Sequence, residues 1–357
     1  GDLYDMIGEL TFAQYQLLSY VREDVRAVYE ADYQEGFGND FGSELHRTNA
    51  VAQLMGVNLL KRLESSVHAF HQTLSRVRKS CADILGRLAA LDACQTDDSG
   101  DRGVVGYGID GLDDGLDDRD AEMFEVGAKI RVNLRDVDRE ALAVDLTHDI
   151  EILDELIGYA SAVTPDRDAK LDALRCLIAQ KTGVGQINTG NKKVLVFSAF
   201  ADTVTYLYDQ LAPSLRKAYG LTCAQVTGTR NRVVGTYQTR GGFEGILGRF
   251  SPRSKETTAL AEREGDIDII FATDCISEGQ NLQDCDCVVN YDVHWNPVRI
   301  VQRFGRVDRL GSTNERIQMV IFWPDMDLES YIKLESRVKA RMALGDASAS
   351  GEENLLT

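Results

Sequence analysis

The 357-residue sequence lacks the segments that mark membrane and exported proteins. It has no run of about 18 apolar residues, which excludes a transmembrane helix. Its first ten residues, GDLYDMIGEL, contain neither a basic segment nor a long apolar core, so they do not form a signal peptide. The sequence begins at Gly1 without an initiator Met, and we therefore expect a fragment or a processed piece. These absences predict a cytoplasmic protein with no membrane partner.

A disulfide framework and a zinc site are also not indicated. The number of cysteines is odd and no CxxC pair occurs, so the sequence favours reduced thiols and no bound metal. The seven cysteines are Cys81, Cys94, Cys176, Cys223, Cys275, Cys285 and Cys287.

Positive charge is scarce, since the formal net charge is -18 and the pI is about 4.7. As a whole this argues against nucleic-acid binding, which needs local positive charge to neutralise phosphates. The excess of negative charge is concentrated in one segment, however. Between Asp92 and Glu125 there are twelve Asp and Glu residues and only two Arg residues. The remainder of the chain is only mildly acidic, which is compatible with a nucleic-acid groove.

The acidic segment, about 93–125, is rich in Gly and Asp and poor in large apolar groups. It cannot bury enough surface to offset its ordering entropy, so we predict a mobile, solvated loop. A calcium loop is the alternative, although the aspartate spacing is not that of an EF-hand. The aspartates concerned are Asp110, Asp113, Asp114, Asp117 and Asp118.

Residues 1–165 are predicted to be all-α. An apolar seam with spacings of three and four runs from Leu60 to Leu91, and a second runs from Ala143 to Ala160. No proline interrupts the first seam. We favour a long, coiled-coil-like helical hairpin, about 45–163, which would offer a surface for a protein partner. The alternative is that these are separate core helices of a globular bundle.

The pattern changes at Thr164-Pro165, where a residue before proline is biased away from helix. A helix restarts at Asp166 or Asp168, and strands then alternate with helices. This alternation predicts an α/β domain, residues 166–325, with a parallel sheet and flanking helices. A C-terminal helix and a loose tail are expected in residues 326–357. The expected strands are residues 193–198, 223–228, 267–271, 287–291 and 316–322.

The stretch from Asp266 to Ser312 carries three motifs. They are Ala272-Thr273-Asp274 through Glu278-Gly279, Trp295-Asn296-Pro297, and Gln302 to Arg309, which reads QRFGRVDR. In order and spacing they resemble motif V, the WNP element and motif VI of superfamily-two helicases of the Swi/Snf type. Lys61 to Ser66 resembles a short element of bacterial Swi/Snf-like helicases. The resemblance implies that residues 166–325 form a second RecA-like lobe.

The resemblance implies a role in ATP hydrolysis for motif VI. Arg306 and Arg309 resemble arginine fingers, which neutralise charge developing on the γ-phosphate, and Gln302 helps to set the site. Gly305 lets the backbone pass close to a ligand. If this segment is helical, the two arginines leave the same face. The alternative for them is a surface salt bridge with Asp308 or Glu315.

Motif V and the strand ends complete the expected site. Asp274 and Gly279 resemble residues that face the nucleotide, and the resemblance assigns nucleic-acid contacts to Ser198, Thr227, Gly228, Thr273 and Trp295. Many Swi/Snf enzymes carry Arg where Asp274 stands, so a DNA contact at that position is not expected. Each Ser or Thr taken alone fits turn capping equally well, and Trp295 can be a packing anchor instead of a base-stacking group.

The sequence contains no GxxxxGK[ST] loop, the element that cradles nucleotide phosphates. By resemblance, ATP and Mg²⁺ are held mainly by a first RecA-like lobe of the same polypeptide, so this chain alone is not expected to hydrolyse ATP. We therefore interpret the complete two-lobe protein as a motor that translocates on duplex DNA. The alternatives are a strand-separating DNA or RNA helicase and a catalytically silent protein-docking module.

Overall fold

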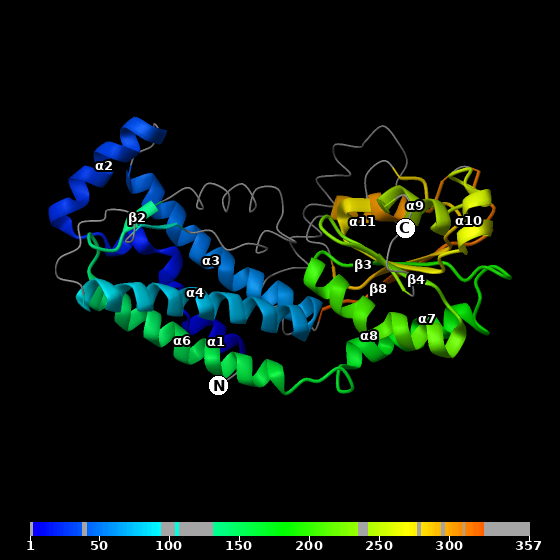
Figure 1. The fold of residues 1–357 in the computed structure, drawn as a ribbon, viewed down its shortest axis with the longest axis horizontal. Coiled ribbons are helices and arrows are strands. Elements are labelled where there is room, and N and C mark those ends of the chain that lie inside the picture. The colour runs from blue at the N-terminus through cyan, green and yellow to red at the C-terminus, as the bar shows by residue number, and fades with distance from the viewer. Residues whose placement is uncertain are drawn as a thin grey trace. The chain divides into compact units, whose positions relative to one another are not determined.

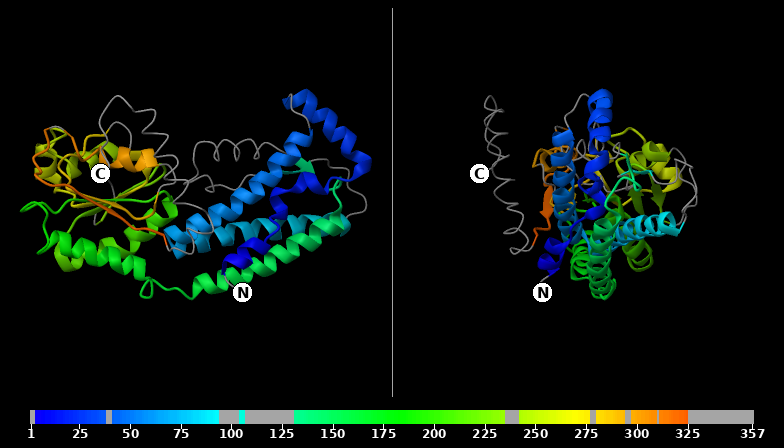
Figure 2. Two further views of the ribbon diagram at one scale, coloured as in Figure 1. Left: turned by 180° about the vertical axis from the view of Figure 1, so that it is seen from behind. Right: turned by 90° about the vertical axis from the view of Figure 1, so that its left-hand side faces the viewer.

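A computed structural model describes residues 3–37, 41–93, 104–106, 131–234, 242–276, 280–293, 297–309 and 311–324. The chain divides into two compact units (Figures 1 and 2). Unit 1 contains Gly1–Leu63 and Phe70–Ala162, and unit 2 contains Glu64–Ala69 and Val163–Thr357. In the part of the chain that the structure describes, no helix combines the length and the apolar character needed to span a bilayer.

Unit 1 is rich in helices, as the sequence predicts. Its helical elements are α1 (Leu3–Glu9), η1 (Ala13–Tyr15), η2 (Leu17–Tyr20), α2 (Glu23–Phe37), α3 (Phe41–Ser65), α4 (Val67–Ala93) and α6 (Arg139–Ser161). Two short strands, β1 (Val104–Gly106) and β2 (Arg131–Asn133), pair antiparallel. Strand β1 falls inside the segment predicted to be a loop, so that prediction is wrong at these three residues. The other residues of the acidic loop lie outside the described ones.

The first apolar seam is divided between two helices, because Ser66 separates α3 from α4. The Ser66 hydroxyl accepts a hydrogen bond from the Ala69 N–H at 3.1 Å, which satisfies one of the unpaired donors at the start of α4. Serine is a preferred residue at this position, so the break has a signal in the sequence that periodicity alone does not reveal.

Helices α4 and α6 lie side by side and antiparallel (Figure 1), and the Arg78 guanidinium pairs with the Asp154 carboxylate at 2.9 Å. Helix α1 and the turns η1 and η2 also pack against α6. The Asp149 carboxylate of α6 is buried and accepts the backbone N–H groups of Thr11 and Ala13 at 2.7 and 2.9 Å. In this part of unit 1 the helices are therefore core helices of a bundle. This was the alternative to the helical hairpin that the sequence favoured.

Unit 2 contains a six-stranded sheet of order β5-β4-β6-β3-β7-β8. All neighbouring strands run parallel except β5, which pairs antiparallel with β4. The strands are β3 (Val194–Phe197), β4 (Cys223–Val226), β5 (Asn231–Val233), β6 (Ile269–Ala272), β7 (Cys287–Asn290) and β8 (Gln318–Ile321). The four central strands β3, β4, β6 and β7 are fully buried and mostly apolar, which is typical of a parallel sheet covered on both faces, whereas the edge strands β5 and β8 are partly exposed.

Helices cover both faces of this sheet (Figure 1). Alternate strand residues point to opposite faces: Val194 and Val196 of β3 join one core cluster, whereas Leu195 and Phe197 join the other. The first cluster contains α7 (Ala169–Thr182) and α8 (Ala201–Tyr219), and the second contains α9 (Gly242–Phe250). The remaining helical elements are α10 (Thr258–Glu264), η3 (Asp274–Ile276) and α11 (Pro297–Phe304).

The predicted α/β class with a mostly parallel sheet is confirmed, and each of the five expected strands is present. The prediction missed β5, whose short and polar sequence has no strand pattern. The residue pattern from Arg249 to Glu264 suggests one helix, whereas α9 ends at Phe250 and α10 begins at Thr258. The predicted helix in residues 326–357 lies outside the described residues.

Candidate nucleotide and nucleic-acid interface

The carboxyl ends of the parallel strands bring several predicted residues to one edge of the sheet. The Ser198 N–H donates to the Ala272 carbonyl at 3.0 Å, and the Thr273 N–H donates to the Val226 carbonyl at 3.1 Å. Ser198, Thr227 and Thr273 are therefore the first residues after β3, β4 and β6 in one continuous ladder. In parallel α/β sheets, ligands bind outside this edge.

Ser198 is fully buried and its hydroxyl is already engaged. It donates to the Asp292 carboxylate at 2.5 Å and accepts the Phe200 N–H at 3.1 Å. Asp292 is itself buried and also accepts the Ala199 N–H at 2.9 Å. The Ser198 hydroxyl and the N–H groups of residues 198–200 are thus all engaged within the lobe, and the predicted nucleic-acid contact of Ser198 stays a prediction.

Thr227 closes the turn between β4 and β5. Its hydroxyl accepts the Arg230 N–H at 2.9 Å and donates to the Arg230 carbonyl at 3.1 Å. This is the turn-capping role that was the alternative for an isolated threonine. Gly228 is exposed at the tip of that turn, and Thr273 is half-buried beside it in the ladder. The predicted contacts of all three with nucleic acid stay predictions.

Asp274 follows β6 in the turn η3, where its carboxylate meets a guanidinium that the motif comparison did not single out. Arg303 is fully buried and pairs with both carboxylate oxygens, Nε to Oδ1 at 2.6 Å and Nη2 to Oδ2 at 2.7 Å. Its third nitrogen, Nη1, donates to Asn290 Oδ1 at 2.7 Å. The guanidinium also lies over the Phe197 ring, 4.9 Å from its centroid.

This arrangement ties motif V to motif VI with a bidentate, charge-assisted pair. Burial of an arginine is stable only when its charge is paired and its donors are satisfied, and both conditions are met at Arg303. Arg303 is therefore a residue that holds the site together, and its signal in the sequence is its place next to Gln302 in the QRxGRxxR pattern. Asp274 keeps about a fifth of its side chain exposed.

Helix α11 ends at Phe304, so Arg306 and Arg309 lie in the turns beyond it. The segment is not a helix at these residues, so the condition for both guanidinium groups to leave one helical face is not met. The Asp308 N–H still donates to the Phe304 carbonyl at 3.0 Å, and the Gly305 N–H donates to the Val301 carbonyl at 2.9 Å. A Cβ on Gly305 would lie 3.4 Å from that same carbonyl oxygen.

The three predicted residues of motif VI differ in exposure. Gln302 and Arg309 are exposed and Arg306 is half-buried. The Arg309 guanidinium donates from Nε to the Gly305 carbonyl at 2.9 Å, and the Leu282 N–H donates to the Arg306 carbonyl at 3.0 Å. Gly279 and Trp295, the other two predicted site residues, lie outside the described residues.

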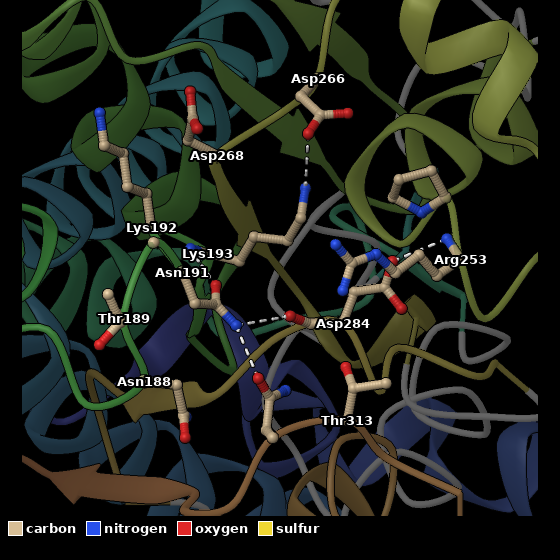
Figure 3. A pocket seen from close by; sticks show the side chains of 13 residues that line it. Asn188, Thr189, Asn191, Lys192, Lys193, Arg253, Asp266, Asp268, Asp284 and Thr313 are labelled. Carbon is tan, nitrogen blue, oxygen red and sulfur yellow. Dashed lines mark hydrogen bonds and ion pairs between the residues drawn. The ribbon is translucent and has the colours of Figure 1, made fainter.

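The opposite edge of the sheet contains a polar cavity of about 410 Å³ that the sequence did not predict (Figure 3). It lies where the chain enters β3 and β6, and Lys193 and Asp266 form an ion pair across it at 3.6 Å. Asn191 donates to the Asp284 carbonyl and to Asn314 Oδ1, both at 2.9 Å. Many of its polar groups thus bind one another, and the cavity contains none of the predicted site residues.

Residues 169–311 match the helicase conserved C-terminal domain. Strands β3 to β7 of the mostly parallel sheet lie within the matched residues, so unit 2 contains a RecA-like helicase C-terminal lobe.

Among curated relatives, the chain is 40% identical over 76 residues to an uncharacterized ATP-dependent helicase, YqhH, of Bacillus subtilis. It is 31% identical over 120 residues to the DEAD-box ATP-dependent RNA helicase CshA of Geobacillus kaustophilus. These matches cover 21% and 33% of this chain and 12% and 25% of the two relatives. The matched part is thus a small fraction of each relative.

The solved structures are less similar to this chain in sequence than the curated relatives are. The C-terminal part of the Fun30 ATPase domain aligns with a TM-score of 0.31 at 16% identity, over 91% of this chain and 86% of that one. The Hef helicase domain of Pyrococcus furiosus aligns with a TM-score of 0.36 at 14% identity, over 94% and 56% of the two chains. Because both scores are below 0.5, the assignment of the lobe rests on the domain match and the sheet.

The donor set at the end of α11 fits part of a nucleotide site. An exposed amide and two guanidinium groups can contact phosphate oxygens, which only accept hydrogen bonds. Mg²⁺ requires carboxylate ligands with open positions. Within the described ranges no group of three His, Cys, Asp or Glu side chains is placed to bind a metal ion. The exposed amide and guanidinium groups therefore fit the phosphate end of ATP.

Proposed function

We propose that unit 2 is the second motor lobe of an ATP-dependent, nucleic-acid-stimulated translocase of the Swi/Snf type, acting on duplex DNA in the cytoplasm. The observation that carries the proposal is the end of α11. There an exposed Gln302 and Arg309 adjoin the buried Arg303–Asp274 pair at the ligand-binding edge of the sheet.

In this proposal the first RecA-like lobe of the complete polypeptide supplies the phosphate loop and the magnesium ligands. Bound ATP supplies a γ-phosphate that gains charge as it is transferred. Arg306 and Arg309 neutralise that charge, and Gln302 orients the groups around it. Arg303 does not touch the phosphate; its pair with Asp274 holds the end of α11 against β6, so that the arginines meet the nucleotide at a fixed position.

At the same edge, the exposed turn at Gly228 would contact the phosphodiester chain of DNA. Such contacts set position and carry no sequence information. Opening and closing of the two lobes would then move the pair along the duplex without separating its strands. The six free cysteines among the described residues are consistent with the proposed cytoplasmic location.

The test is Arg306→Ala in the complete polypeptide, with ATP turnover measured with and without duplex DNA. DNA-stimulated turnover should fall by about 10³-fold or more, the usual contribution of an arginine finger. Arg175→Ala is the matched control, because Arg175 is exposed on α7 and pairs only locally with Asp172. Wild-type turnover in the Arg306 variant would refute the assignment.

A second candidate is a strand-separating helicase, favoured by the relatives that are DEAD-box RNA helicases. A strand-displacement assay with labelled DNA and RNA duplexes distinguishes the two, because a translocase turns over ATP without releasing the labelled strand. The third candidate is a catalytically silent lobe beside a protein-docking surface in unit 1. DNA-stimulated ATP turnover by the complete polypeptide would exclude it.

A further inference from the structure

A six-residue segment, Glu64–Ala69, belongs to unit 2 although its sequence neighbours on both sides belong to unit 1. We call it the junction clip. It contains the end of α3, Ser66 and the first turn of α4. Ser65 and Ser66 are buried, and their hydroxyls meet polar groups of unit 2 that are more than 130 residues away in the sequence.

The clip hydroxyls form a chain that ends on a carboxylate. The Ser66 and Thr203 hydroxyls are 2.8 Å apart, Thr203 and Ser65 are also 2.8 Å apart, and Ser65 donates to Asp292 Oδ2 at 2.6 Å. Ser198 donates to the same oxygen at 2.5 Å. All five side chains are buried, with at most 3% of each residue exposed.

Counting protons fixes the direction of the chain. A hydroxyl carries one proton, and Ser65 gives its proton to Asp292, so Ser65 must accept from Thr203. The single proton of Thr203 is then used, so Thr203 accepts from Ser66. Ser66 completes its own set by accepting the Ala69 N–H at 3.1 Å. Every member is satisfied, which is the condition under which a buried polar network specifies one arrangement.

Two further contacts hold the clip on unit 2. The Lys170 ammonium donates to the carbonyls of Glu64 and Ser65 at 2.6 and 3.2 Å, which are unpaired acceptors at the end of α3. The His68 ring stacks on Tyr206 of α8, with centroids 4.9 Å apart and planes within 9°. The clip is therefore bound through its backbone, its hydroxyls and an aromatic face.

The chain of hydroxyl groups ends at Asp292 and Ser198, which lie at the ligand-binding edge of the sheet, and this position suggests its role. Ser198 is the residue after β3, where the nucleic-acid contact is expected, and Asp292 lies five residues before the first residue of α11. We propose that Ser65 and Thr203 are positioning residues for nucleic acid. By fixing Asp292 against Ser198 they set the two chain segments that leave the ligand-binding edge at β3 and β7. This inference rests on the proposed function; Ser65 lies in the short Lys61 to Ser66 element, to which no role was assigned, and Thr203 lies in none of the motifs.

The experiment compares Thr203→Val with Thr203→Ser in the complete polypeptide. Valine keeps the shape and removes the hydroxyl, whereas serine keeps the hydroxyl. Binding of a fluorescent DNA duplex is measured by anisotropy, and ATP turnover is measured across DNA concentrations. In the valine variant the dissociation constant and the half-saturating DNA concentration should rise about fivefold to tenfold, the equivalent of one lost hydrogen bond. The serine variant should stay within about twofold of wild type.

Ser65→Ala should behave like Thr203→Val or be more severe, because it removes a donor to Asp292 as well. Ser214→Ala, on the same helix as Thr203 with its hydroxyl bonded only to local carbonyls, is the matched control. Equal DNA binding by the valine and serine variants would overturn the inference, as would a change in maximal rate without a change in half-saturating DNA. Wild type that binds DNA without stimulated turnover would instead contradict the proposed function, and the anisotropy comparison would still decide the role of the clip.

Discussion

The two edges of the unit 2 sheet are built from similar residues but expose them differently. At the carboxyl edge, Gly228, Gln302 and Arg309 point outward, where a ligand can reach them. At the amino edge, the amide and charged groups around the cavity bind one another, as Asn191 does with Asn314 (Figure 3). A polar cavity in which many lining groups bind one another is therefore a poorer sign of function here than a helix end with exposed donors.

Each edge also contains one buried ion pair. At the carboxyl edge Arg303 pairs with Asp274, and at the amino edge the Lys181 ammonium pairs with Asp286 at 2.9 Å. The first pair joins two motifs that flank the proposed nucleotide site. The second supports the loop before β3, since Lys181 also donates to the Asn191 carbonyl at 2.8 Å. We expect both pairs to matter for stability and only the first to matter for ATP turnover.

The largest effect on stability is expected for Asp274→Ala. It leaves the fully buried Arg303 guanidinium without its carboxylate, and breaking a buried pair in this way costs about 3–5 kcal/mol of the free energy of unfolding. Denaturant unfolding monitored by circular dichroism measures it. Asp308→Ala removes an exposed carboxylate nearby and should change the value by less than about 0.5 kcal/mol. Equal stability of the two variants would show that Arg303 does not depend on Asp274.

The matching change at the amino edge is Asp286→Ala, with an expected cost of about 3 kcal/mol, the lower end of the same range. The cost is lower because the Lys181 ammonium keeps the Asn191 carbonyl as a partner. In the complete polypeptide this variant should retain its affinity for ATP and DNA at temperatures where it is folded, whereas Asp274→Ala should lose turnover. Loss of turnover in both variants, while both are folded, would remove the functional difference between the two edges.

The α/β half of the fold could be predicted because buried parallel strands have an unmistakable pattern of short apolar runs. The motifs also predicted which residues would meet at the carboxyl edge, since strand ends share one edge in a parallel sheet. The Arg303–Asp274 pair could not be derived from spacing, because 29 residues separate the partners and only the fold brings them together. The end of α11 before Arg306 could not be derived either, because a single glycine in the motif does not by itself mark the end of a helix.

The helical half was harder to predict. Apolar spacing located the helices but not their partners, because a seam on α6 fits α4 and α1 equally well. The hydrogen bonds of Asp149 with Thr11 and Ala13 join segments that are far apart in the sequence, and no sequence pattern predicts them. The role of Ser65 was missed for a similar reason. A serine at the end of a helix is usually a surface residue, and only the packing against Asp292 makes it part of the ligand-binding edge.

Glu64 gives the junction clip a pH dependence. Burial raises the pKa of its carboxyl from 4.5 to about 7, with a further upward contribution from Asp292, against the opposing effect of Lys170. A carboxyl whose pKa is raised in the folded state favours folding while protonated. The free energy of unfolding should therefore fall as the pH rises from about 4.5 to about 7, by at most about 1.4 kcal/mol per unit, and then level off.

Glu64→Gln tests this dependence, because the amide stays neutral throughout that window. The difference in unfolding free energy between wild type and the variant should shrink or reverse with rising pH, and remain constant above pH 7. Lys170→Met is the complementary variant: it removes the nearby cation, so the Glu64 carboxyl should titrate at a still higher pH. A difference that does not vary between pH 4.5 and 7 would show that Glu64 is ionised throughout.

The smallest effect is expected at the cavity of the amino edge. Asn191→Ala removes three side-chain hydrogen bonds, to the Asp284 carbonyl, to Asn314 and from the Lys193 N–H, in a half-buried position that water can reach. Water can replace these partners, so the cost should be about 1 kcal/mol. Lys192→Ala, whose side chain is exposed at the same rim, should cost less than about 0.5 kcal/mol. Neither variant should alter ATP turnover or DNA binding in the complete polypeptide. A loss of either activity at unchanged stability would make the amino edge a second ligand site, and the contrast between the two edges would then be wrong.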